Sequence, residues 1–226
     1  MSTELEQKQQ PAATPMKLVV FGATGGTGRY VLKYALEKGM LVRAYVRNPS
    51  KMTITHDRLE VVKGNLLDEE MVEKAMEGMD YAISVAGHSG KNYPKRMMEN
   101  FIKAVIRGAR KHQVKRVIYQ AGAFNPSPGQ KMPMKLKMMR AVFGRMKRLM
   151  KMVKDNDRVV LFLNAIEDVD WVITRPGMLS DKPSQGELIS ANEMAPGTVS
   201  FTDLAKYTVG LLDNPEYEHQ HPYPGY

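Results

Sequence analysis

The sequence predicts a doubly wound α/β protein with a mostly parallel sheet in one domain, residues 16–226. Short apolar runs rich in β-branched residues alternate with longer segments whose apolar residues recur every three or four positions. Strands that alternate with helices pair in parallel through right-handed crossovers, so helices cover both faces of the sheet. The length of 226 residues fits one domain, and 43% hydrophobic with 25% charged residues is a globular composition.

The first predicted unit is a strand, a turn and a helix. Residues 17–21 form an apolar run that ends in a glycine-rich stretch. Residues 29–38 follow with apolar side chains at helical spacing, and Gly39 favours the end of that helix. This order places a glycine-rich turn between a buried strand and a helix.

Further apolar runs predict five more strands, with helices in the gaps between them. The clearest helix spans residues 94–111, where one apolar stripe runs along the segment and Pro94 suits a first-turn position. Thr202 is expected to cap a last helix that runs to Leu212. The other strands are expected at residues 41–46, 59–62, 80–85, 114–119 and 170–174.

Composition and motifs exclude several classes of site. The chain has no Cys, which rules out disulfides, thiolate metal ligands and a Cys nucleophile. Its five His show no paired spacing that would bind a metal, and neither a Gly-x-Ser-x-Gly turn nor a Walker loop occurs. Residues 1–15 lack the apolar run of a signal peptide and are expected to form a mobile tail. No run approaches the ~20 apolar residues of a membrane span, so we expect a cytoplasmic protein.

The positive charge is concentrated in one segment. Of a net charge of +9, residues 131–158 hold ten Lys or Arg against two Asp, a balance of +8. We expect this basic, Met-rich segment to be helical. Apolar residues recur there at spacings of three and four, at Leu136, Met139, Phe143, Met146, Met150 and Val153.

Two interpretations of this segment remain open. In the first, the stripe packs on the domain or covers a substrate pocket, and the lysines are merely solvated. In the second, the helix docks on an acidic protein partner, an anionic membrane surface or an acidic substrate. Nucleic acid fits less well, because aromatic side chains that stack on bases are nearly absent from the segment.

The glycine-rich turn has the pattern of a nucleotide-binding loop. Gly22, Gly25 and Gly28 follow the first strand and open the first helix. Glycines at this spacing allow a tight turn and close approach of a pyrophosphate, which the N-terminus of the helix then faces. The pattern therefore predicts a dinucleotide cofactor.

The loop after the second strand favours NADP(H) over NAD(H). A carboxylate at this place would bind the ribose 2′-hydroxyl and repel a 2′-phosphate. No carboxylate occurs there; Arg47, Ser50 and Lys51 offer a guanidinium, a hydroxyl and an ammonium instead. A planar guanidinium suits a phosphate.

The order of these motifs resembles that of the atypical short-chain dehydrogenase/reductases, which are NAD(P)H-binding Rossmann proteins. Within them the chain looks closest to the biliverdin IXβ reductase/flavin reductase group. The resemblance extends from Met16 almost to residue 226. The segments that carry it are residues 21–28, 46–51, 63–66, 114–118, 174–177 and 214–224.

The resemblance implies a set of cofactor contacts and an oxidoreductase activity. The group Gly22, Thr24, Gly25, Gly26, Thr27 and Gly28 would line the phosphates, and Arg47, Ser50 and Lys51 would hold the 2′-phosphate. Asn65, where the family usually has Asp, and Leu66 would meet the adenine. Ala86 and Gly87 would lie beside the nicotinamide-side ribose.

The usual catalytic side chains of these relatives are missing. The only Tyr-x-x-x-Lys spacing is Tyr34 to Lys38, in the first helix, and we interpret it as coincidence. Gly122 and Gly177 stand where the biliverdin-type relatives carry a serine and a histidine. Hydride transfer without a dedicated acid suits flavins, quinones, tetrapyrroles and similar conjugated acceptors.

Two residues near the expected pocket could still act on a substrate. His88 follows the fourth strand, with Tyr93 five positions later, and its ordinary pKa near neutrality suits a proton donor; it could equally be a solvated loop residue. Arg175 could orient an anionic substrate or pack within the Arg-Pro turn. The alternative function is a non-catalytic, redox-sensing regulator that binds NADP(H), as NmrA-type relatives do.

Overall fold

Six parallel strands form the central sheet of the computed structural model, which describes residues 14–87, 94–143, 147–191 and 197–226. The side chains of residues 135, 136, 139, 143 and 147–149 lie outside this description. The strand order is β3-β2-β1-β4-β5-β6, so the chain reverses direction across the sheet between β1 and β4. The strands are β1 (Lys17–Phe21), β2 (Leu41–Val46), β3 (Leu59–Lys63), β4 (Tyr81–Ser84), β5 (Arg116–Gln120) and β6 (Trp171–Thr174).

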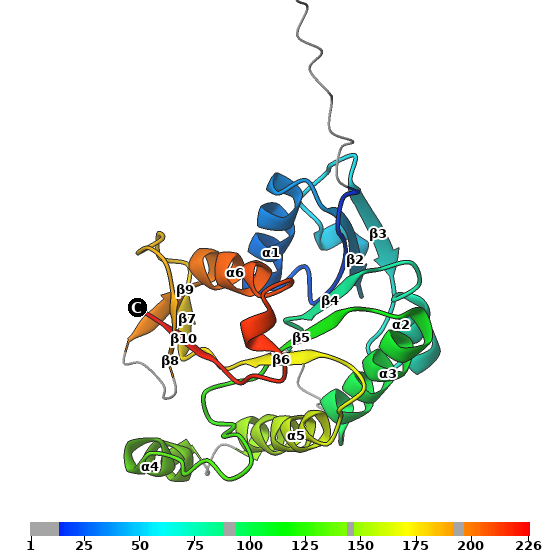
Figure 1. Cartoon of the computed structure of the whole chain (residues 1–226). Coiled ribbons are helices and arrows are strands. Elements are labelled where there is room, and N and C mark those ends of the chain that lie inside the picture. Colours follow the sequence, from blue (N-terminus) through cyan, green and yellow to red (C-terminus); the bar gives the residue numbers. More distant parts are fainter. Residues whose placement is uncertain (1–13, 88–93, 144–146, 192–196) are drawn as a thin grey trace, which may run out of the picture.

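Helices cover both faces of the sheet, as the alternating pattern predicts (Figure 1). Helices α1 (Gly26–Glu37) and α6 (Phe201–Gly210) pack together on one face, and α2 (Glu69–Lys74), α3 (Met97–His112) and α5 (Lys147–Asn164) cover the other. Alternate residues of β1 divide between the two cores: Leu18 and Val20 point to the first, Val19 and Phe21 to the second. The doubly wound α/β prediction is confirmed.

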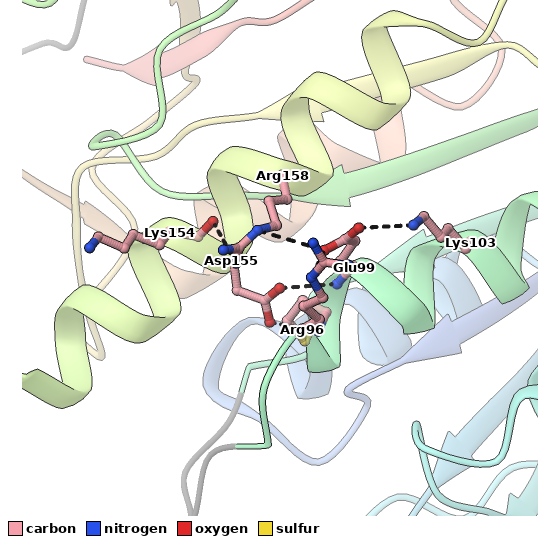
Figure 2. A network of polar contacts seen from close by, with 7 residues as sticks. Arg96, Glu99, Lys103, Lys154, Asp155 and Arg158 are labelled. Carbon is pink, nitrogen blue, oxygen red and sulfur yellow. Dashed lines mark hydrogen bonds and ion pairs between the residues drawn. The ribbon is translucent and has the colours of Figure 1, made fainter.

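The N-terminus of α3 differs from its prediction. The helix begins at Met97, so the expected first-turn role of Pro94 is wrong. Arg96 at the N-cap has a left-handed backbone and makes no side-chain cap. The carboxylate of Asp155, from α5, accepts hydrogen bonds from the backbone N–H of Met98 (2.8 Å) and Glu99 (3.4 Å) instead (Figure 2). A partner distant in sequence thus replaces the local cap.

Ionic contacts surround this shared junction of α3 and α5. The carboxylate of Glu99 lies 2.8 Å from the Lys103 ammonium, 3.4 Å from Arg96 and 3.8 Å from Arg158 (Figure 2). The hydrogen bond from Lys103 lowers the pKa of Glu99 against the opposing effect of burial. The network fixes α5 against the start of α3.

The last helix is also capped by a residue other than the expected one. Helix α6 begins at Phe201 and ends at Gly210, and its N-cap is Ser200, whose hydroxyl accepts from the N–H of Asp203. Thr202 therefore lies inside the first turn, and the predicted cap is wrong by two positions. Ser200 is the better cap because Asp203 stands three residues on, where it accepts back from the Ser200 hydroxyl.

The basic segment forms two helices rather than one. Helix α4 (Met134–Phe143) and α5 are separated by residues 144–146, which lie outside the described residues. In Figure 1, α4 stands beyond α5 and away from the sheet. Helix α5 continues to Asn164 because Val159, Val160 and Leu163 extend its apolar face into the core.

Short elements complete the described chain. Segment 219–222 runs beside β6, where Ile173 N–H donates to Gln220 O and Arg175 N–H to Pro222 O, both at 3.0 Å. No helix in the described ranges is long and apolar enough to cross a membrane. The expected tail, residues 1–15, lies almost wholly outside the description. The short elements are η1 (Pro49–Lys51), β7 (Met178–Ser180), β8 (Ile189–Ala191), β9 (Thr198–Ser200), η2 (Pro215–Tyr217) and β10 (Tyr223–Gly225).

Candidate functional site

The glycine loop connects β1 to α1 at the carboxyl edge of the sheet. Gly22 has φ +88°, and a Cβ there would stand 2.6 Å from the Cα of Ala86 at the end of β4. A Cβ on Gly28 would stand 2.1 Å from the Gly22 carbonyl oxygen, which accepts from Gly25 N–H at 2.9 Å. Gly22 and Gly28 are required where they stand, because no side chain fits.

The N-terminus of α1 is open to an anion. Gly25 is its N-cap and provides no side-chain hydrogen bond, and the first turn contains no acidic residue. The first N–H groups of a helix have no partner within the helix, and together with the helix dipole they favour a negative charge. The loop therefore fits a phosphate group.

Phe201 is a part of this site that sequence reasoning missed. A Cβ on Gly26 would stand 2.5 Å from Cζ of the Phe201 ring, which opens α6. The ring therefore packs directly against the glycine loop. Only the position of an aromatic residue at the start of the last helix could have suggested it.

The predicted 2′-phosphate residues lie beside the glycine loop. Phe21 pairs with Tyr45 in the sheet, so the ends of β1 and β2 are adjacent. Arg47, Ser50 and Lys51 are all exposed. Within the described chain, neither Arg47 nor Lys51 forms an ion pair. Their charges are available to a ligand.

The structure explains why this loop holds its shape. The side chain of Asn48 accepts hydrogen bonds from the N–H of Ser50 (3.2 Å) and from its hydroxyl (2.8 Å). Pro49 occupies the first turn of η1. Arg47 and Lys51 therefore flank a short, locally fixed turn.

The end of β3 brings the predicted adenine residues to the same edge. Gly64 N–H donates to Val46 O at 2.9 Å, and the Tyr45 hydroxyl donates to Asn65 O at 3.1 Å. Burial raises the pKa of Tyr45 to about 12, so the phenol stays protonated and keeps this bond. Asn65 is exposed and Leu66 half-buried, which leaves one polar and one apolar group beside the Arg47 loop.

A buried polar atom without a partner lies at the end of each of the strands β4, β5 and β6. The hydroxyl oxygens of Ser84 and Thr174 and the Oε1 of Gln120 have no hydrogen-bond partner among the described residues. Ser84 is the last residue of β4, while Gln120 and Thr174 pair in register and end β5 and β6. Buried polar groups normally have partners, so this edge suits a polar ligand. Polar residues at strand ends were a signal that the sequence reasoning did not use.

The structure brings together the two glycines at the relatives' catalytic positions. Ala121 N–H donates to Thr174 O and Ala123 N–H to Pro176 O, so the segments containing Gly122 and Gly177 lie side by side. A Cβ on Gly122 would meet only Asn125 Oδ1, at 3.7 Å, and one on Gly87 would meet nothing within 4 Å. Glycine at these positions provides no acid, and a side chain at Gly122 would fit without overlap.

The remaining predicted residues lie elsewhere. His88 and Tyr93 are outside the described residues. Tyr34 and Lys38 are at the C-terminal end of α1, opposite the glycine loop. Arg175 is buried and bonds to the segment that runs beside β6, so it packs in the fold and does not point into solvent.

Two comparisons of sequence relate this site to known proteins. A family model described as NAD(P)H-binding matches residues 22–215. Cinnamoyl-CoA reductase 1 of Arabidopsis thaliana is 34% identical over 110 residues, which cover 44% of this chain and 32% of that protein. Cinnamoyl-CoA reductase 2 of the same plant is 34% identical over 128 residues, 50% of this chain and 38% of that protein. The matched stretches span about a third of the length of these curated relatives.

Solved structures match nearly the whole chain. The oxidoreductase ylbE from Lactococcus lactis is 20% identical with a TM-score of 0.76, covering 92% of this chain and 90% of that one. ChuY from Escherichia coli O157:H7, an anaerobillin reductase, is 22% identical with a TM-score of 0.72, covering 92% and 96%. At such identities the likeness shows a shared fold.

Proposed function

The chain belongs to the NAD(P)H-binding family of Rossmann proteins, and from that premise we propose that it is an NADPH-dependent oxidoreductase. Its acceptor would be a flavin, a quinone, a tetrapyrrole or a similar conjugated small molecule. The observation that carries the proposal is the open N-terminus of α1 at the glycine loop, with unpaired Arg47 and Lys51 beside it.

Different residues would bind different parts of the cofactor. The N–H groups at the start of α1 would hold the pyrophosphate, and Arg47, Ser50 and Lys51 the 2′-phosphate. Asn65 and Leu66 would border the adenine, and Ala86 and Gly87 the ribose next to the nicotinamide. A bound nicotinamide supplies the hydride, while the protein orients it.

The absence of a side chain at Gly122 and Gly177 suits a flat acceptor. No side chain at these positions donates a proton, which favours acceptors that take a hydride without a dedicated acid. ChuY, of the same fold, is described as an anaerobillin reductase, and this supports a tetrapyrrole among the acceptors. His88, which follows β4 in the sequence, is our proposed proton donor.

Steady-state assays test the proposal directly. Purified protein would be given NADPH or NADH with flavin, quinone or tetrapyrrole acceptors, and we expect turnover with a preference for NADPH. The Gly22→Ala variant supplies the background rate. Tight NADPH binding without turnover on any acceptor would overturn the oxidoreductase.

Such a result would favour the second candidate, a redox-sensing regulator that binds NADP(H) without chemistry. The observation in its favour is glycine at both catalytic positions, with open space at Gly122. Its signature would be a partner protein captured differently in the presence of NADP⁺ and NADPH.

For the basic segment 131–158 we propose contact with a membrane surface rich in anionic lipid. Met134, Met138 and Val142 follow one another at a spacing of four along α4 and are 71%, 64% and 68% exposed. Lys131 and Lys137 are exposed beside them. Exposed apolar side chains on a cationic helix are typical of interfacial binding. These three residues are not members of the predicted stripe, whose side chains on α4 lie outside the description; on α5 the stripe residue Val153 is buried.

A further inference from the structure

The structure contains a cavity that is separate from the nucleotide loops. It measures about 500 Å³, within the range of small-molecule sites. The loop after β5, strand β8 and the segment around η2 form its walls. The residues that matter for its chemistry are Ser127, Gln130, Arg175, Ser190, Tyr217 and His221. None of the predicted cofactor residues lines it.

Arg175 brings a buried positive charge to this cavity. Its residue is 2% exposed, and its guanidinium lies 3.8 Å from the centre of the Tyr223 ring. The Nε and Nη2 groups donate to His221 O, and Nη1 donates to Gln130 Oε1 (2.8 Å) and to the Tyr223 hydroxyl (3.1 Å). Every one of these acceptors is neutral.

No carboxylate compensates this charge within the described chain. Burial lowers the pKa of Arg175 against a smaller opposing effect of the Tyr223 phenol, and no carboxylate contributes. Glu216 lines the same cavity but is exposed and forms no ion pair with the guanidinium. Buried charges in proteins are usually paired with an opposite charge, so the arrangement lacks an anion.

His221 adds a second polar group without a partner. Its Nε2 lies 3.1 Å from Asn164 Oδ1, while Nδ1 is buried and has no hydrogen-bond partner among the described residues. Burial, with a smaller effect of Arg175, lowers the pKa of His221 to about 4. The ring is therefore neutral at pH 7, with its one N–H donated to Asn164 Oδ1 and with Nδ1 as an acceptor, so His221 itself does not bind an anion.

We propose that this cavity binds a small organic anion through a carboxylate or phosphate group. Arg175 supplies the charge, the hydroxyl of Ser127 supplies a hydrogen-bond donor, and the cavity volume accommodates more than a bare ion. The site is separate from the cofactor loops, so the inference does not depend on the proposed oxidoreductase activity.

The substitution Gln130→Glu tests the site without removing its charge. Gln130 Oε1 already lies 2.8 Å from Arg175 Nη1, so glutamate would place a permanent carboxylate against the guanidinium. We expect it to compete with the ligand and weaken anion binding roughly tenfold or more, while the fold stays intact. Gln185→Glu is the matched control: it makes the same change at an exposed glutamine outside the cavity.

Calorimetric titration of the full chain with inorganic phosphate and with malonate, at constant ionic strength, gives the readout. Saturating NADPH keeps phosphate out of the nucleotide loops, and neither glutamine variant changes those loops, so a difference between the variants reports on the cavity alone. Saturable binding by one of the anions that Gln130→Glu loses and Gln185→Glu retains would support the site. Equal binding in all three proteins, or no saturable binding of either anion to the wild type, would overturn it. Turnover is not measured, so failure of the proposed activity would leave this test unaffected.

Discussion

Gly22 is the residue on which the nucleotide loop depends most directly. Alanine there must adopt φ +88° and must also place its Cβ 2.6 Å from the backbone of Ala86. We expect Gly22→Ala to abolish nucleotide binding and to destabilise the protein by several kcal/mol, since both strain and overlap add. Fluorescence titration with NADPH and urea unfolding measure the two effects.

The variant Gly78→Ala separates the cost of backbone strain from that of steric overlap. Gly78 has φ +72°, and a Cβ there would meet nothing within 4 Å. Gly78→Ala should therefore cost only about 1–2 kcal/mol, the strain of a left-handed backbone, and should leave nucleotide binding unchanged. Equal losses of stability in the two variants would show that the contact with Ala86 is unimportant.

Arg47 should decide between the two nucleotides. Arg47→Ala removes a charge-assisted contact to the 2′-phosphate, which we expect to cost on the order of 1.5–3 kcal/mol, or about 10- to 100-fold in the Kd for NADPH. The Kd for NADH should hardly change. Lys111→Ala, at an exposed position near the end of α3, controls for net charge. Equal losses for both nucleotides would contradict this role of the β2 loop.

At this scale the sequence predicted where the glycines and the cations of the two loops lie, while their contacts with a cofactor stay a prediction. Gly22, Gly28 and Arg47 occupy the places that strand, turn and helix order assigned to them. Phe201 could not be predicted, and the polar residues that end β5 and β6 were a local signal that does not show their burial. Their role arises from packing between segments more than 50 residues apart, and no local pattern encodes such a contact.

Asp155 joins two helices. Its carboxylate accepts from two N–H groups at the start of α3. Asp155→Ala leaves those buried donors without a partner, so we expect a loss of about 1–3 kcal/mol and faster hydrogen exchange at Met98 and Glu99. Asp57→Ala, in an exposed loop, is the control. Unchanged exchange at these two amides would show that Asp155 does not cap α3.

Helix α4 should bind anionic vesicles through its exposed apolar face. We expect wild-type protein to sediment with vesicles that contain phosphatidylserine at low salt. The triple variant Met134→Gln, Met138→Gln, Val142→Gln should lose most of this binding, because it removes the apolar face and keeps helix propensity and charge. Neutralising Lys147, Arg148 and Lys151 should weaken it in a salt-dependent way.

Two results would contradict the membrane proposal. Vesicle binding equal in wild type and the apolar triple variant would show that α4 does not insert. Binding to an acidic peptide, with none to vesicles, would indicate a protein partner instead.

Helical periodicity predicted the basic segment but not its division. The spacing of three and four continues through Gly144, so one helix was the simplest interpretation. The structure places the two parts in different surroundings: α5 packs against α3, while three apolar side chains of α4 are exposed. The exposed residues form a second apolar face that the predicted stripe does not include, and the side chains of the stripe on α4 lie outside the description.

Asp203 connects distant parts of the whole molecule. Its carboxylate accepts hydrogen bonds from Ser184, from the backbone of Gln185 (2.8 Å) and from the Tyr226 hydroxyl (2.7 Å), besides that of Ser200. Burial alone would raise the pKa of Asp203, but these bonds together lower it to about 2. The folded state therefore favours the ionised carboxylate.

This linkage predicts an acid-sensitive contribution to stability. An ordinary Asp in the unfolded chain has a pKa of about 3.9, so the contribution is complete above that pH and is lost as pH falls from about 4 toward 2. The difference in unfolding temperature between wild type and Asp203→Asn should shrink across that window. Asp213→Asn, at an exposed carboxylate, controls for charge. Parallel loss of stability in wild type and Asp203→Asn below pH 4 would contradict the linkage.

The doubly wound α/β topology could be predicted because strands and helices alternate along the sequence. The short strands β7 to β10 could not be predicted. Each is only three residues long, too short for a period to emerge, and each exists because a distant segment supplies its hydrogen bonds. The cavity that β8 helps to form could therefore not be predicted from the sequence.

The course of segment 219–222 beside β6 also affects how copies of the protein meet one another. An open sheet has two bare margins, and either can recruit a strand from another molecule and start aggregation. Here backbone hydrogen bonds from Ile173 and Arg175 to segment 219–222 cover the β6 margin. The Arg175 guanidinium also donates to the His221 carbonyl of that segment. The opposite margin, β3, exposes Glu60 and Lys63, whose charges discourage pairing. The protein thereby protects one margin with its own chain and the other with charge, which favours solubility at high concentration.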